Sequence, residues 1–193
     1  MKKLSFVFVL GIATMAFQAC GDADNDNDTI NSNTTTENRI DSTDAMEDEQ
    51  NETSKFMVKA ANGGMMEVEL GNLAKEKATN ASVKEFAAMI VKDHSNANDE
   101  LKSLAASKSI TLPATMDNDH RDHVTDLSNK SGNDFDKAYM DMMVSDHKKD
   151  IDMFEDILDD NDIAPELKAF ANKTLPVLKK HHEEAKRIYD SLK

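Results

Sequence analysis

The sequence contains no tryptophan, one cysteine and three prolines, and aromatic residues make up only 5% of it. A single cysteine excludes an intrachain disulfide. Methionine, leucine, alanine, lysine and glutamate fill the second half of the chain instead, and these residues favour helix over sheet. At 193 residues the chain has room for one core with accessory segments. The composition therefore predicts an all-α fold.

Positive charge is also scarce, because 23 Lys and Arg residues stand against 37 Asp and Glu residues and leave a net charge of −14. Binding to nucleic-acid phosphates or to an anionic membrane surface needs a basic footprint, which this chain lacks. We therefore expect no nucleic-acid partner. The acidity is concentrated in residues 21–53, which hold eleven Asp and Glu residues and one Arg.

The first twenty residues have the three parts of a secretory signal: Lys2 and Lys3, the apolar run 4–17, and a short segment before Cys20. The apolar run is shorter than the roughly 20 residues that span a bilayer. The residues around Cys20 resemble a bacterial lipobox, although two positions are atypical. We expect residues 1–19 to be a lipoprotein-type signal peptide and Cys20 to carry a lipid that anchors the protein to a membrane, in the outer membrane. The alternative is cleavage to a soluble periplasmic or secreted form.

Residues 20–53 consist mainly of Asp, Asn, Thr, Ser and Glu. So little apolar surface cannot offset the entropy of ordering the chain. We predict that residues 20–53 form the lipid anchor and a disordered acidic tether, and that the folded domain spans residues 54–193.

Beyond Ser54, apolar residues recur at alternating spacings of three and four, which indicates helices with one buried face. The pattern predicts a short helix over residues 120–129 and four long helices over residues 54–79, 82–107, 134–159 and 165–192. A capping box at Ser82 and a first-turn Pro165 mark two of the starts. Pro176 predicts a kink or a break. Four helices of similar length with mostly short joints favour an up-down four-helix bundle.

Four polar residues lie on the apolar faces, each near the midpoint of one long helix: Glu67, His94, His147 and His181. Because the midpoints of antiparallel helices share a layer, we expect these side chains to meet. One carboxylate and three imidazoles would suit one divalent transition metal, which could be zinc, iron, manganese or copper. The alternative is a metal-free polar network in which Glu67 pairs with a protonated histidine, since buried polar groups are normally hydrogen-bonded.

Asp93 and Asp146 directly precede two of these histidines, His94 and His147. Neighbouring helical residues point about 100° apart, so neither aspartate should contact its own neighbour. Each could orient a histidine on an adjoining helix, but we expect both to be boundary or surface groups. We interpret the methionines as core packing rather than copper ligands. No nucleophilic triad, phosphate loop or catalytic cysteine is evident, so no catalytic residue is predicted.

Several motifs in the folded part are similar to those of one bacterial family; they span residues 60–71, 91–94, 135–140, 144–147 and 173–181. Over residues 54–193 the chain resembles the domain-of-unknown-function family 4142. The resemblance implies an exported, ferritin-like four-helix bundle with no settled activity, and its motif positions fall on the four polar midpoint residues. Ferritin-like di-iron sites use Glu-x-x-His, whereas Val91, Val144 and Leu178 precede the histidines here by three residues. A single metal, or none, is therefore expected.

These features together predict a cell-envelope lipoprotein that displays a metal-binding helical bundle, with a role in metal binding or envelope stress physiology. The alternative is a metal-free helical interaction module, which an exposed apolar groove would favour. An enzyme is the third hypothesis, and it would require an open coordination position and a cleft that reaches the central layer.

Overall fold

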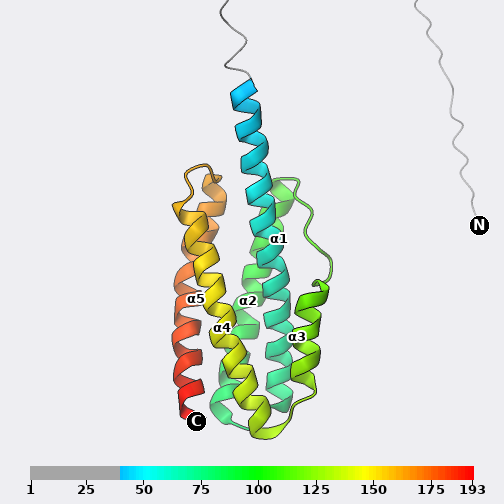
Figure 1. The fold of residues 1–193 in the computed structure, drawn as a ribbon. Helices are drawn as coiled ribbons and strands as arrows, with labels where there is room; N and C mark the ends of the chain where they lie inside the picture. Colours follow the sequence, from blue (N-terminus) through cyan, green and yellow to red (C-terminus); the bar gives the residue numbers. More distant parts are fainter. Residues whose placement is uncertain (1–39) are drawn as a thin grey trace, which may run out of the picture. The chain divides into compact units, whose positions relative to one another are not determined.

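The computed structural model describes the backbone of residues 40–193 and the side chains of residues 51–193. This part consists of helices and their connections and contains no strand: α1 (Ile40–Lys77), α2 (Ala81–Ser107), α3 (Asn118–Ser128), α4 (Gly132–Asp159) and α5 (Pro165–Ser191) (Figure 1). The predicted all-α fold is confirmed. The predicted signal peptide, Cys20 and the tether up to residue 39 lie outside the described residues.

The four long helices form two antiparallel pairs, α1 with α2 and α4 with α5 (Figure 1). Between the pairs, residues 108–131 lead the chain back along α1, with the short helix α3 in their middle. Because of this long connection, α2 and α4 run in the same direction (Figure 1). A four-helix bundle with one long crossover has the ferritin-like connectivity.

The starts of α2 to α5 lie within two residues of the predicted positions, whereas the start of α1 and the cap of α2 differ from the prediction. Helix α1 begins at Ile40 rather than Ser54, because helix formation is cooperative once nucleated and acidic residues are favourable near a helix N-terminus. Helix α2 is capped by Asn80, whose side chain accepts a hydrogen bond from the Ser82 backbone N–H at 2.9 Å. The predicted capping box at Ser82 is therefore wrong, and asparagine is an equally good cap. Helix α5 continues unbroken through Pro176.

The turn between α1 and α2 is held by a carboxylate from another helix. Asp136, near the start of α4, is buried and accepts hydrogen bonds from the Thr79 N–H at 3.0 Å, the Thr79 hydroxyl at 2.6 Å and the Asn80 N–H at 2.9 Å. These contacts satisfy backbone donors that the end of α1 and the start of α2 would otherwise leave free. They also fix the position of α4 along the axis of the α1–α2 pair.

The apolar core is divided into two clusters along the bundle. One cluster lies toward the α1–α2 turn and includes Leu70, Ile90 and Met143, and the other lies toward the opposite end and includes Phe56 and Phe154. The four polar midpoint residues belong to neither cluster. The fold therefore places them in a middle layer, between two apolar layers and away from the helix ends.

Candidate metal centre

The four predicted residues come together in this middle layer, one from each long helix. Their relative exposure is 1% for Glu67 on α1, 7% for His94 on α2, 0% for His147 on α4 and 1% for His181 on α5. The three imidazole rings form a nearly equilateral triangle, with centroid separations of 5.4, 5.4 and 5.3 Å. The convergence that the helical spacing predicted is thus present in the structure.

Two of the histidines have their outer ring nitrogens against hydrogen-bond acceptors. His147 Nδ1 lies 3.0 Å from the Met143 carbonyl oxygen, and His181 Nε2 lies 3.1 Å from Asp93 Oδ2. Carbonyl and carboxylate oxygens accept hydrogen bonds, so each outer nitrogen must carry the ring proton. The inner nitrogens, His147 Nε2 and His181 Nδ1, are 3.3 Å apart. With both rings neutral, two lone pairs face each other there, and either a proton shared between the two nitrogens or a metal ion bound by both would satisfy them.

His94 and Glu67 complete the layer with unsatisfied polar atoms. His94 Nδ1 lies 2.7 Å from Glu67 Oε2, and His147 Nδ1 lies 3.2 Å from Glu67 Oε1. The angles of both contacts depart from those of a hydrogen bond, so the two carboxylate oxygens are paired only through charge, and buried His94 Nε2 has no partner at all. Buried polar groups are normally satisfied. These atoms therefore indicate that the layer can accept a further species.

The electrostatics of the layer leave one negative charge to be balanced. Burial alone would raise the pKa of Glu67, but the charges of His94 and His147 lower it to about 2. Burial lowers the pKa of His147 to about 4, and it also lowers the pKa of His181. Burial opposes protonation of His94, yet the neighbouring Glu67 charge raises the His94 pKa overall. Ionised Glu67 can thus be balanced by a proton on His94 or by a metal ion.

One pair of ring nitrogens has the spacing of two ligands of a tetrahedral metal, and the third histidine lies close to that pair. One nitrogen from each of His94, His147 and His181 can be chosen so that all three lie within 4.8 Å of one another. Metal–nitrogen bonds of about 2.0–2.1 Å in a tetrahedron place two nitrogens roughly 3.4 Å apart. The 3.3 Å between His147 Nε2 and His181 Nδ1 matches this spacing. Glu67 lies beside Nδ1 of His94 and Nδ1 of His147. In His147 this is the outer nitrogen, not the one that faces His181.

One of the two aspartates orients a histidine on an adjoining helix, which was the alternative to a purely boundary or surface position. Asp93 is 30% exposed, and its Oδ2 contacts His181; α2 packs beside α5, which helical periodicity alone cannot show. Asp146, in the equivalent sequence position on α4, instead pairs with Lys149 at 3.0 Å. The two similar Asp-His segments therefore differ, and only Asp93 joins the histidine layer.

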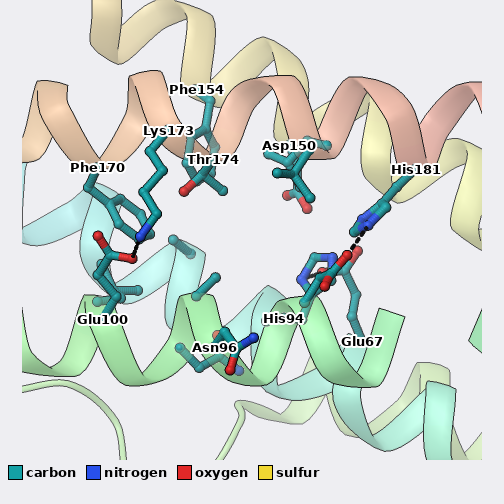
Figure 2. Close-up of a pocket in the computed structure, with 18 of the residues that line it drawn as sticks. Glu67, His94, Asn96, Glu100, Asp150, Phe154, Phe170, Lys173, Thr174 and His181 are labelled. Carbon is teal, nitrogen blue, oxygen red and sulfur yellow. Dashed lines mark hydrogen bonds and ion pairs between the residues drawn. The ribbon is translucent and has the colours of Figure 1, made fainter. Parts of the chain in front are cut away.

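A cavity of about 230 Å³ reaches the middle layer from the side. Figure 2 shows it between α2 and α5, with Glu67, His94 and His181 at one end and the Lys173–Glu100 ion pair at the other. Burial raises the pKa of Asp150, and the charge of Glu67 raises it further. Asp150 also lines this cavity, which the sequence does not reveal, because a cavity is formed by several helices at once.

The fold and this layer define the protein as a ferritin-like helical bundle with a buried histidine cluster. The chain belongs to the family described as domain of unknown function DUF4142, which matches residues 40–188. No curated protein is significantly similar to the chain.

Two solved structures share the fold. A DUF305 fragment from Deinococcus radiodurans is 12% identical, with a TM-score of 0.65 over 72% of this chain and 96% of the other. A DUF305 protein from Streptomyces coelicolor, named as a candidate secreted protein, is 11% identical, with a TM-score of 0.63 over 73% of this chain and 93% of the other. At these identities the likeness establishes the fold alone.

Proposed function

We propose that this protein binds one divalent transition metal ion in the cell envelope, through Nε2 of His94, Nε2 of His147 and Nδ1 of His181. One observation carries the proposal: the outer nitrogens of His147 and His181 face obligate acceptors, so their inner nitrogens present lone pairs 3.3 Å apart. The unpartnered Nε2 of His94 supplies the third ligand. Three imidazole ligands suit zinc and would leave a fourth coordination position open.

Glu67 and Asp93 support this ligand set from outside it. Metal-bound histidines commonly donate their other N–H to a carboxylate, which fixes the ring and raises its basicity. Asp93 accepts such a hydrogen bond from His181 Nε2, and Glu67 lies beside the Nδ1 atoms of His94 and His147. Two carboxylates would also balance the two positive charges of the metal. We therefore propose Glu67 as a residue that holds the ligands, in place of the metal ligand predicted from the sequence.

The metal-free interaction module has less support. Such a module would expose an apolar surface of several hundred square ångströms. Within residues 51–193, however, the large hydrophobic side chains that are exposed amount to Val177 alone, at 37%. No described helix is long and apolar enough to cross a membrane. The location in the envelope rests on the signal-like residues 1–19 and on Cys20, and a role in envelope stress physiology would follow from metal binding there.

The direct test is metal analysis of protein purified without a histidine tag. We expect about one zinc equivalent by elemental analysis or, after chelation, by calorimetric titration with zinc, manganese, iron(II) and copper. Free zinc at 100 times Kd should stabilise the fold by about 2.7 kcal/mol. For a domain of this size that corresponds to roughly 5–10 °C in Tm.

A triple His→Leu variant at positions 94, 147 and 181 distinguishes the metal centre from a buried polar network. Replacing a whole buried network by apolar residues can be neutral or stabilising, so the variant can still fold, but it must lose every zinc-dependent change in Tm. If no metal co-purifies and none changes the Tm of the unmodified protein, the metal proposal is wrong and the polar network stands.

A further inference from the structure

The cavity beside the histidine layer has two chemically different parts. Its walls are mainly apolar and include Leu101, Phe154 and Phe170. Its outer end carries the Lys173–Glu100 pair, whose Nζ and Oε2 atoms are 2.6 Å apart on largely exposed side chains. Such a surface ion pair contributes little stability and opens readily. The cavity is therefore an apolar space that a small molecule can enter from solvent.

The inner end of the cavity holds polar groups that the protein leaves available. Asp150 of α4 points into the space in Figure 2, and its carboxyl makes no hydrogen bond within the described part of the chain. Opposite it lies His94, whose unpartnered Nε2 is the proposed third metal ligand. An apolar pocket with a few convergent polar groups is the usual form of a small-molecule site. His94 and His181 both line this end, so a metal ion that they hold would lie beside the cavity.

The charges at the inner end restrict the head group of a ligand. Glu67 and Asp93 neutralise the proposed metal, and Asp150 adds a third carboxyl group at this end, which disfavours an anionic head. A divalent metal repels a cationic head, and a protonated amine has no lone pair for the metal. A neutral hydroxyl suits both the metal and the carboxyl groups, because its oxygen can coordinate the metal while its O–H donates a hydrogen bond to Asp150. Asp150 can accept that hydrogen bond in either protonation state.

We infer that the cavity between α2 and α5 binds a small neutral alcohol with an apolar body, whose hydroxyl oxygen occupies the open metal position and whose O–H donates to Asp150. This inference rests on the metal centre proposed above. The volume of about 230 Å³ sets the size of the body. An apolar cavity of about 150 Å³ accommodates benzene, so a benzyl group with one hydroxyl fits the larger space.

The probe is benzyl alcohol, added to the full mature chain loaded with cobalt(II), whose visible absorption reports its coordination. Cobalt titration comes first, and an absence of cobalt binding would overturn both the metal centre and the alcohol site. Benzyl alcohol should then change the cobalt spectrum saturably and bind at least tenfold more tightly than three controls that share its ring. Toluene has no polar head group, benzoate has an anionic one and benzylamine has a cationic one. Cobalt binding without this preference would overturn the alcohol site alone.

Variants locate the effect in the cavity. Ala97→Phe, on the cavity wall contributed by α2, should lower the affinity for benzyl alcohol at least tenfold and leave the cobalt affinity unchanged. Ala88→Phe, on an exposed face of the same helix, is the matched control and should change neither. Asp150→Ala should lower the affinity for benzyl alcohol, whereas Asp150→Asn keeps an acceptor oxygen and should retain that affinity. Equal alcohol affinity in Ala97→Phe and Ala88→Phe proteins would exclude the cavity as the site.

Discussion

At the scale of single residues, the protonation of three imidazoles decides what the middle layer can bind. In each neutral histidine, one ring nitrogen carries a proton and the other has a free lone pair. The hydrogen-bond acceptor beside the ring determines which nitrogen is protonated. The Met143 carbonyl and Asp93 assign the protons of His147 and His181 to the outer side. The lone pairs are thereby directed inward before any ligand arrives, so little rearrangement accompanies metal binding.

Glu67→Gln tests whether this carboxylate binds the metal or only holds the histidines. The change removes the charge and keeps the size, so zinc affinity should fall roughly 10–100-fold, as for other groups that orient metal ligands. His147→Leu removes a ligand and should abolish binding. Calorimetric zinc titration measures both. If Glu67→Gln abolishes binding as completely as His147→Leu does, Glu67 coordinates the metal directly.

The two similar Asp-His segments supply a matched pair of variants. Asp93→Ala removes the acceptor of the His181 Nε2 proton, so the ring loses its fixed orientation and zinc affinity should fall about tenfold. Asp146→Ala alters the equivalent position on α4, where the side chain pairs with Lys149, and should leave the affinity within about twofold. Competition with a zinc-binding dye gives both values. Equal losses in the two variants would contradict a specific role for Asp93.

At the scale of helices, periodicity predicted the long elements well because each has one continuous apolar face. It placed Glu67, His94, His147 and His181 inward, and the structure brings the four together. Helix starts were less accessible to this reasoning. Asn80 and Ser82 are both good caps by type, and the choice between them depends on the turn conformation that Asp136 holds from another helix. A contact between residues 56 positions apart leaves no periodic signal.

Asp136→Ala should destabilise the bundle by about 3 kcal/mol, because hydrogen bonds to a charged group contribute roughly 1.5–3 kcal/mol and their loss leaves part-buried donors of Thr79 and Asn80 unpaired. Asp134→Ala, at an exposed first-turn position of α4, is the control and should cost less than about 1 kcal/mol. Urea unfolding measures both. A loss in the Asp136 variant no larger than in the control would show that the turn does not depend on this carboxylate.

At the scale of the whole molecule, the crossover containing α3 determines which helices become neighbours. It sets α2 beside α5 and α1 beside α4, so that the Asp93–His181 contact and the cavity arise between elements far apart in sequence. Neither could be predicted from single-helix patterns, because both depend on the order of helices around the bundle. The sequence did predict a polar middle layer, since all four midpoints carry a polar residue. The fold then isolates that layer between two apolar clusters.

The net charge of the molecule leads to a prediction about its attachment. With a charge of −14, the chain has no electrostatic attraction to an anionic membrane, so membrane association should depend on a lipid at Cys20. We expect the mature protein to sediment with membranes and its N-terminal peptide to have the mass of a lipid-modified cysteine. Cys20→Ser should abolish the modification and, with signal cleavage blocked, leave residues 1–19 attached. A wild-type protein found in the soluble fraction, with a mature N-terminus other than residue 20, would contradict the lipid anchor and favour a soluble periplasmic or secreted form.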